Sequence, residues 1–396
     1  MTNVSLFSQI LQLVPRHIFQ SLVREYRTDK HSKGFDTWTH LVSMLLCHFG
    51  RLHSLRDIAM GLRTIAGNAN HLGIMKKVPC KSSLSYQNEN RDWQFFRELY
   101  QKLFAYFQNE RGLLRRKQFH DIKEKIYLID STVISVCLSV FDWALYRQQK
   151  GAIKIHTMLD YDGLLPVYAR VTPAKQNDSK HASYMVMPEG SVIVADRGYQ
   201  SFQMFYQWHK RKISFVVRLK RNILHERVEE RDLPEGEDEH IIVDEVIRLM
   251  DEETGNHYPE NLRRVVVYDK KHGRKIELVT NNLSWTAATV AELYKQRWRI
   301  EVFFKELKQH LKIKSFLGMN ENSMHIQIWT ALITMLLLRV LREQATFRWN
   351  LSNLVVFLRV NLFVKIELFL WLNNPFYSPR EAVKGIEQMS IWPRGD

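Results

Sequence analysis

The sequence predicts an α/β protein: a mixed sheet with a β-rich insertion, between an N-terminal and a C-terminal helical region. Three changes of pattern along the chain predict this organisation. Apolar residues recur every three or four positions up to about residue 115, as in amphipathic helices. Short apolar runs rich in β-branched residues follow from about residue 120, and helical patterns return after residue 287. We therefore expect five segments, namely 1–118, 119–222, 223–286, 287–345 and 346–396.

The composition is that of a globular protein with an anionic partner. The 396 residues are enough to bury a sizeable core, and a hydrophobic content of 45% excludes a mainly disordered chain. Lys and Arg number 57 against 42 Asp and Glu, so the net charge is +15. Such an excess favours a polyanion such as nucleic acid.

Cysteine usage and hydropathy indicate the compartment. Cys47, Cys80 and Cys137 are odd in number and widely spaced, without a CxxC pair, which favours the reducing cytoplasm. The N-terminal residues lack the basic segment and cleavage site of a signal peptide. The apolar stretches 326–341 and 355–372 are too short, or too interrupted by polar residues, to span a membrane. We expect both to be buried helices.

The N-terminal region is predicted to be helical. Apolar spacing predicts helices over about 18–26 and 38–49, and Ser54 and Ser82 are suitable N-caps for two later helices. The helix at Ser82 opens with residue types that hydrogen-bond phosphates and base edges, namely Ser82, Ser83, Ser85, Gln87, Asn88, Asn90 and Arg91. Two interpretations stay open: a helix-turn-helix-like DNA reader, and a helical bundle with a polar outer face.

The central segment has the pattern of strands. Apolar, β-branched runs lie at 125–136, 152–159, 164–171, 191–196 and 214–221, with an amphipathic helix at 202–212. The Asp-Tyr-Asp-Gly sequence between the second and third runs is a hairpin signal. In the predicted insertion, an acidic loop over 226–244 precedes a second hairpin formed by 263–269 and 275–281.

Two aspartates lie on these apolar strands. Asp130 is inside the first run and Asp196 ends the run Val-Ile-Val-Ala. A buried carboxylate is costly unless it is paired or binds a metal, and the carboxyl edge of an α/β sheet commonly hosts ligands. A lone aspartate at a strand end is common, so the pair carries the prediction. A third acidic side chain would complete a set of oxygen ligands for a hard divalent cation.

Glu301 is the candidate for that third carboxylate. At about 100° per residue, Tyr294, Arg297, Glu301 and Lys308 share an arc of about 60° on one helix face. An adjacent apolar face comprises Ile300, Phe303, Phe304, Leu307 and Leu311. The helix can therefore pack on the sheet while presenting one carboxylate flanked by two cations. An amphipathic surface helix with scattered ion pairs has the same pattern and stays an alternative.

These residues carry a resemblance to a known family. Ile-Asp-Ser-Thr at Asp130, Ala-Asp-Arg-Gly-Tyr at Asp196, and the spacing Tyr-x2-Arg-x3-Glu-x6-Lys from Tyr294 to Lys308 follow one another along the chain. In this they resemble DDE transposases of the bacterial insertion-sequence-four family. The resemblance runs from about 120 to 345, and about 75 residues at the N-terminus resemble a domain often found on such proteins.

The resemblance implies a ribonuclease-H-like fold whose last catalytic helix is separated from the sheet by the β-rich insertion. It implies an enzyme that cuts the ends of a mobile element and joins them to target DNA. Asp130, Asp196 and Glu301 would be the catalytic residues and the metal ligands. Two Mg²⁺ ions are expected, with Mn²⁺ as a substitute, to activate water or a 3′-hydroxyl and to stabilise the leaving oxygen.

The resemblance also implies the DNA contacts and partners. Tyr294, Arg297 and Lys308 would contact phosphates of the element end, and Arg197, directly after the second aspartate, is a further candidate. The expected partner is double-stranded DNA, both terminal repeats and target. A homodimer is expected in the DNA complex because two ends must be brought together. The expected location is the bacterial cytoplasm at the nucleoid, without a membrane partner.

Other functions stay open from the residues alone. A metal-dependent nuclease would use the same carboxylates without a joining step, and an inactive DNA-binding repressor would not need them. A membrane-associated protein conflicts with the interrupted apolar stretches. Some family members hold a displaced base on an aromatic residue of the insertion; Tyr258, Tyr268 and Trp285 lie in that region, and no spacing selects one.

Overall fold

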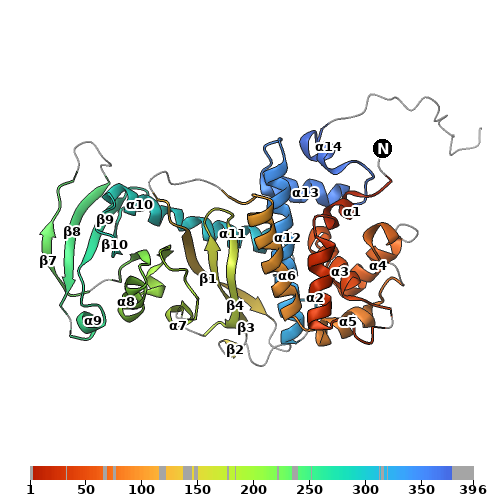
Figure 1. Ribbon diagram of the computed structural model, residues 1–396, viewed down its shortest axis with the longest axis horizontal. Coiled ribbons are helices and arrows are strands. Elements are labelled where there is room, and N and C mark those ends of the chain that lie inside the picture. The colour runs from red at the N-terminus through yellow and green to blue at the C-terminus, as the bar shows by residue number, and fades with distance from the viewer. Residues whose placement is uncertain are drawn as a thin grey trace, which may run out of the picture.

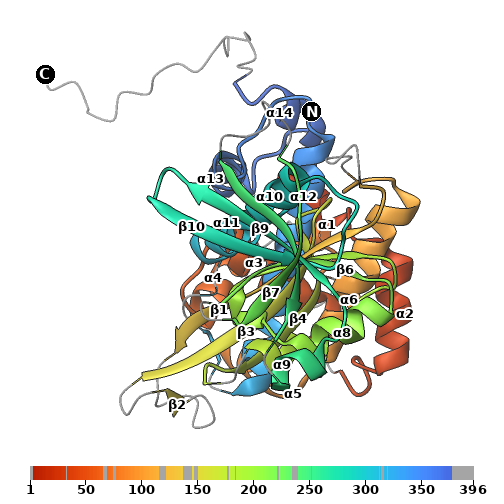
Figure 2. The same cartoon turned by 90° about the vertical axis from the view of Figure 1, so that its left-hand side faces the viewer.

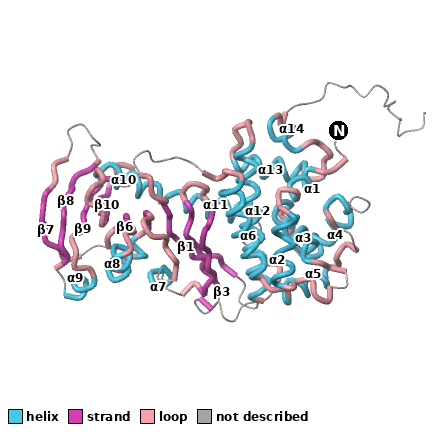
Figure 3. Tube along the Cα trace, viewed as in Figure 1, coloured by secondary structure: helices cyan, strands magenta, loops and turns pink. Residues whose placement is uncertain are grey.

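The computed structural model describes residues 3–376 except 33, 66–68, 75–76, 116–121, 137–144, 147–149, 176–177, 183, 221–222, 234–239, 251, 312, 314–315 and 319. Cys137 therefore lies outside the described residues. The molecule is elongated, with a sheet at one end and a helical bundle at the other (Figure 1). Colouring by secondary structure separates the two halves in the same way (Figure 3).

Helices from both ends of the chain build the helical half. They are α1 (Leu6–Leu11), α2 (Arg16–Tyr26), α3 (Thr37–Gly50), α4 (Leu55–Thr64), α5 (Lys81–Asn90), α6 (Gln94–Ala105), α12 (Glu321–Gln344), α13 (Leu351–Asn361) and α14 (Leu368–Asn373). The short helices η1 (Ala69–Leu72) and η2 (Tyr106–Glu110) complete it. α12 packs against α3, α5, α6 and α13, so the chain's two ends share one core.

The predicted helix starts are right at one site and wrong at the other. Ser54 caps α4, because its side chain accepts a hydrogen bond from the Asp57 amide. Ser82 is not a cap: α5 begins at Lys81, one residue earlier, with Cys80 in the cap position.

Two polar residues that we assigned to the exposed face of α5 are structural. Asn88 is buried and bonded to His40, and Arg91 is buried and donates to the Phe35 and Asp36 carbonyls. Lys81, Ser82, Tyr86 and Asn90 remain exposed. The outer face of α5 is therefore narrower than the sequence pattern indicates.

The long apolar helix α12 is a core helix. By length and composition it is the one described helix that could cross a membrane, yet its apolar window is entirely buried inside the protein. The expectation for 326–341 is confirmed.

The expectation for the second apolar stretch, 355–372, is wrong in part. It is divided between α13 and α14, and only one side is buried. Leu358 and Leu372 lie in the core, whereas Val356, Val360 and Leu370 are exposed. A short helix on the surface of a bundle buries only the face that it turns to its neighbours.

The sheet has a ribonuclease-H-like centre. Its strands there are β1 (Ile126–Val136), β2 (Leu145–Tyr146), β3 (Lys150–Asp160), β4 (Leu165–Pro173), β5 (Val192–Ala195) and β6 (Ser214–Arg218). In space the order is β4-β3-β1-β5-β6, with β2 also pairing on β3. β3 is antiparallel to both β1 and β4, whereas β1, β5 and β6 are parallel. This order and these directions define the mixed ribonuclease-H-like sheet.

Four further strands extend the same sheet. They are β7 (His225–Glu230), β8 (Ile241–Leu249), β9 (Leu262–Asp269) and β10 (Arg274–Thr280), with α9 (Glu252–His257) between β8 and β9. β10 pairs antiparallel with β6, so the sheet has ten strands and twists strongly when viewed from the β7 end (Figure 2). The acidic loop predicted over 226–244 is wrong, because its ends form β7 and the start of β8. β7 is an edge strand with five of its six residues exposed, so it lacks the apolar alternation of a strand.

Helices cover the two faces of the sheet. α7 (Asp178–Ala182) and α8 (Phe202–Lys210) lie on one face, and α10 (Ala287–Gln296) and α11 (Trp298–His310) on the other (Figure 1). Leu128 and Val194 belong to the core on the α10–α11 face, whereas Ile129 and Ala195 belong to the core on the α8 face. Side chains alternate between the two faces along each strand. The side chains of Asp130 and Asp196, which follow Ile129 and Ala195, therefore point towards α10 and α11.

Candidate active site

The register between β1 and β5 brings the two predicted aspartates together. The strands are parallel, and Ile129 of β1 pairs with Ala195 of β5. Asp130 and Asp196 are the next residues, so they lie side by side, midway along β1 and directly after β5, facing α10 and α11.

The helical segment that carries the third acid is not one continuous helix. Arg297 separates α10 from α11, although its own dihedral angles stay helical (φ −52°, ψ −32°). Tyr294, Arg297 and Glu301 consequently keep a common direction, towards the aspartates. The apolar face is as predicted: Ile300, Phe303, Phe304, Leu307 and Leu311 are buried.

Arg297 joins two of the three carboxylates. Its Nη2 atom donates to Glu301 Oε1 at 2.6 Å, and its Nη1 atom donates to Asp130 Oδ2 at 3.4 Å. Burial of this side chain opposes its charge, but Tyr294, Glu301 and Asp130 outweigh that effect, and the pKa of Arg297 is raised. The guanidinium is the counter-charge of the site.

The environment of Asp130 disfavours its charged form. Desolvation raises its pKa to about 6, and the neighbouring charges of Glu301 and Asp196 push in the same direction. The Ser131 amide, which donates to Asp130 Oδ1 at 2.8 Å, and Arg297 oppose the rise without cancelling it. A carboxylate in this environment would be stabilised by a further cation.

Tyr294 contacts the remaining aspartate. Its hydroxyl donates to Asp196 Oδ1 at 3.2 Å. Burial raises the pKa of Tyr294 to about 12, and the Asp196 charge adds to the rise against the opposing Arg297. The tyrosine is therefore a neutral hydrogen-bond donor at neutral pH.

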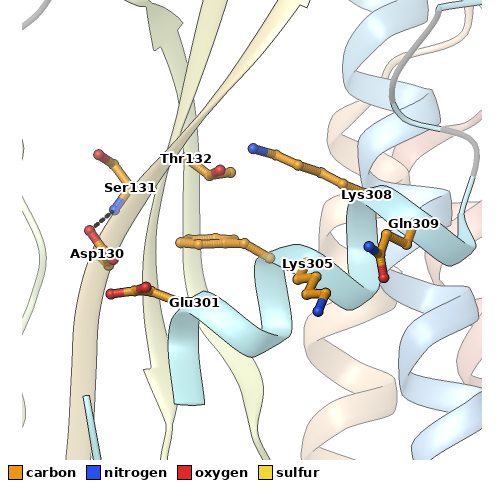
Figure 4. A pocket seen from close by; sticks show the side chains of 8 residues that line it. Asp130, Ser131, Thr132, Glu301, Lys305, Lys308 and Gln309 are labelled. Atoms are coloured by element: carbon orange, nitrogen blue, oxygen red, sulfur yellow. Dashed lines mark hydrogen bonds between the residues drawn. The ribbon is translucent and has the colours of Figure 1, made fainter. Parts of the chain in front are cut away.

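Lys308 lies at the far end of a hollow beside the carboxylates. The hollow, about 510 Å³, is lined by Asp130, Ser131, Thr132, Glu301, Phe304, Lys305, Lys308 and Gln309. Figure 4 shows Asp130 and Glu301 at one end and Lys308 extending from α11 towards β1 at the other. Lys308 Nζ donates to the Val133 carbonyl at 2.9 Å. The hollow thus has a negative end and a positive end.

The other predicted residues vary in accessibility. Arg197 is exposed in the short helix η5 (Arg197–Tyr199), directly after Asp196. Of the aromatic candidates in the insertion, Tyr258 is fully buried and bonded to His209, which removes it from consideration as a base-holding residue. Trp285 is half-buried against the core, and Tyr268 is exposed.

The sequence reasoning did not select Asp178, which lies behind the aspartates. Its Oδ1 atom accepts a hydrogen bond from Ser131 Oγ at 2.8 Å and from Lys154 Nζ at 3.2 Å. The alternation of Lys154 and His156 on one face of β3 was the available signal that polar groups gather there. Asp178 itself lies on a short connecting helix, which no periodicity marks.

The donor set suits a hard divalent cation, although the side chains do not form a closed cage. Within the described stretches, no group of three or more His, Cys, Asp and Glu side chains is preorganised around one point. Arg297 bonds both Asp130 and Glu301. Carboxylate oxygens are nevertheless the ligands that Mg²⁺ and Mn²⁺ prefer. Burial is the main cause of the raised pKa of Asp130, with the nearby acidic charges adding to it.

Comparison with known families identifies the class of this chain as a DDE-type phosphoryl-transfer domain. The model of the family described as "Transposase DDE domain" matches residues 121–337, more than half of the chain. The chain therefore belongs to this transposase family, whose members depend on a divalent metal and act on DNA. Residues 2–75 match a "Domain of unknown function (DUF4372)".

Several bacterial relatives are named as transposases. The protein y4zB of Sinorhizobium fredii is 33% identical over 231 residues, which are 58% of this chain and 64% of that protein. The transposase of insertion sequence element IS5377 from Geobacillus stearothermophilus is 29% identical over 57% of this chain and 59% of its own length. That of element IS4SA from Synechocystis sp. is 26% identical over 74% and 81%. The chain thus spans less than two thirds of the first two relatives. Assignment to the insertion-sequence-four family stays a prediction.

One solved structure with a similar chain is the piggyBac transposase synaptic complex with hairpin DNA. It is 13% identical, with a TM-score of 0.43, and the match covers 90% of this chain and 78% of that one.

Proposed function

We propose that this chain is a DNA transposase that binds the ends of an insertion sequence, cleaves them and joins the 3′ ends to target DNA. The observation that carries the proposal is that Arg297 bonds both Asp130 and Glu301, while the β1–β5 register places Asp196 beside Asp130. Metal-dependent phosphoryl transfer needs carboxylates that lie close together, because the metal ions that they hold also bind the reacting phosphate.

Asp130, Asp196 and Glu301 would hold two Mg²⁺ ions, for which Mn²⁺ could substitute. When bound, the metal supplies charge stabilisation and lowers the pKa of the attacking hydroxyl or water. The Arg297 guanidinium would leave Glu301 and Asp130 as the metal binds, because the guanidinium and the metal ion cannot both bind the same carboxylate oxygens. Its freed guanidinium could then reach a DNA phosphate, for which its planar fork is suited. In the absence of DNA, the Tyr294 hydroxyl donates to Asp196 Oδ1.

The DNA would follow the cationic side of this cluster. Lys308, Arg197 and Arg297 supply the charge for phosphate contacts, and Tyr294 supplies a neutral donor. The exposed face of α5 is the further DNA contact that we propose in the N-terminal region, through Lys81 and Ser82. With six to ten phosphate contacts, affinity for DNA would fall by roughly 10³- to 10⁵-fold between 50 and 200 mM salt. A homodimer would hold the two ends.

The test is a strand-transfer assay with purified protein, Mg²⁺ and labelled duplexes taken from the DNA that borders the coding sequence. Pre-cleaved ends that become joined to a target plasmid support transposition. Cleaved product that is never joined would identify the nuclease alternative and overturn the proposal. Specific binding with neither reaction, in Mg²⁺ and in Mn²⁺, would identify an inactive repressor and overturn it equally.

A further inference from the structure

Asp178 lies where α7 meets strands β1 and β3. It begins α7, and its Oδ1 atom accepts hydrogen bonds from Ser131 Oγ on β1 and from Lys154 Nζ on β3. His156 Nδ1, also on β3, lies 3.4 Å from the same atom. Its side chain is 26% exposed, so the ion pair with Lys154 is shielded from water on most sides. The carboxylate is thus held in one place by groups that are themselves fixed in the sheet.

Ser131 connects Asp178 to the first aspartate. The Ser131 amide donates to Asp130 Oδ1 at 2.8 Å, while the Ser131 hydroxyl donates to Asp178 Oδ1 at 2.8 Å. Successive side chains on a strand point to opposite faces, so Ser131 faces Asp178 while Asp130 faces α11. Asp178 therefore anchors, from behind, the amide that orients the Asp130 carboxylate.

Asp178 also borders the segment that follows the second aspartate. α7 packs against η5, which begins directly after Asp196. A side-chain carbon added at Gly198 would lie 3.8 Å from Asp178 Oδ2. Asp178 thus bonds the residue that follows Asp130 and belongs to the helix that packs against the segment following Asp196.

We propose that Asp178 is a positioning residue for the divalent-metal site. Through Ser131 it fixes the direction of the Asp130 carboxylate, and by packing on η5 it limits movement of Asp196. This inference rests on the proposed metal-dependent function. Hydrogen bonds to metal-binding carboxylates orient them, and loss of such a partner typically weakens metal affinity by about 10- to 100-fold.

The test is a titration of the full chain with Mn²⁺ in the absence of DNA, in which electron paramagnetic resonance measures the bound Mn²⁺. Asp178→Ala is expected to raise the Mn²⁺ concentration at half-saturation by on the order of tenfold or more. Asp162→Ala is the matched control, because Asp162 is also 26% exposed and also pairs with a lysine, Lys125 at 3.0 Å. Asp162→Ala is expected to leave the Mn²⁺ midpoint unchanged.

Two further variants separate positioning from a merely structural ion pair. Ser131→Ala should shift the Mn²⁺ midpoint in the same direction, and combining it with Asp178→Ala should add little, because the two act through one hydrogen bond. Asp178→Asn keeps an acceptor oxygen for Ser131 and should recover most of the affinity. A purely structural pair with Lys154 predicts no such recovery, and predicts that Lys154→Met reproduces the loss in place of Ser131→Ala.

The outcomes distinguish this inference from the proposed function. If the wild-type chain binds no Mn²⁺, or if Asp130→Ala leaves its Mn²⁺ binding unchanged, the proposed function fails. If the wild type binds Mn²⁺ through Asp130 but Asp178→Ala behaves like Asp162→Ala, the positioning role alone is overturned. If Asp178→Ala does not fold, Ser131→Ala decides: a normal Mn²⁺ midpoint overturns the inference, and a raised one supports it.

Discussion

Arg297 Nη1 lies 3.4 Å from Asp130 Oδ2, although the two residues are 167 positions apart in the chain. The same guanidinium bonds Glu301. One side chain thus ties the last helix of the site to its first strand and balances two of its three negative charges. The arginine and a metal ion would compete for the same oxygens.

Arg297→Met should therefore destabilise the metal-free protein. It leaves two neighbouring carboxylates without their counter-charge, one of them largely buried, and we expect the free energy of unfolding in EDTA to fall by about 1–3 kcal/mol. Added Mg²⁺ should then raise the melting temperature more in the variant than in the wild type. Lys295→Met, which breaks only the exposed pair with Glu292, is the control. Equal Mg²⁺ responses in the two variants would contradict the competition.

Asp130→Asn should stabilise the metal-free protein while removing its activity. Burial raises the pKa of Asp130 to about 6, so ionisation costs the folded state free energy that is fully present above pH 6 and vanishes below about pH 4. We expect a gain on the order of 1 kcal/mol at pH 7.5, measured by urea unfolding in EDTA, and none at pH 4. Asp162→Asn should change stability by less than about 0.5 kcal/mol. If Asp130→Asn lowers the unfolding free energy at pH 7.5, the ionised Asp130 carboxylate does not destabilise the folded protein.

Much of this site was predictable from the sequence. The apolar runs on either side of Asp130 and Asp196 gave both strands, and the 294–308 spacing gave the helix face, because these signals are local and periodic. The pairing of Ile129 with Ala195 could not be derived, since register depends on tertiary packing. The interruption at Arg297, the exposed strand β7 and the place of Asp178 were missed for a related reason. Each is decided by neighbours that lie far away in the chain.

His48 should make the helical half sensitive to acid. It is fully buried between α3 and α12, bonded to Thr330, and desolvation lowers its pKa to about 3. Below pH 6.5 the unfolded chain takes up a proton that the folded chain refuses, so stability falls as pH drops from about 6.5 towards 3. His48→Gln should reduce this slope by up to about 1.4 kcal/mol per pH unit in chemical unfolding. The exposed His53, changed to Gln, should leave the slope unaltered; equal slopes for wild type and His48→Gln would exclude this role.

The insertion contains an ion pair on which its strands depend. Arg263 on β9 forms a bidentate ion pair with Asp244 on β8. Its Nε atom donates to Oδ1 at 2.8 Å and its Nη2 atom to Oδ2 at 2.6 Å, and both side chains are buried. Asp244→Ala leaves the guanidinium unpaired, and we expect a loss of about 3–5 kcal/mol in unfolding free energy. Glu230→Ala breaks an exposed pair with Arg227 at 2.8 Å and should cost less than about 1 kcal/mol. Similar losses for the two variants would refute the distinction.

The most direct test of the central claim compares DNA cleavage by three single variants: Asp130→Ala, Asp196→Ala and Glu301→Ala. Each is assayed in Mg²⁺ beside a binding measurement on the same DNA. If the three carboxylates form one metal site, every variant loses cleavage by on the order of 10³-fold or more while DNA affinity is retained. Wild-type cleavage by any one of the three folded variants would contradict the account.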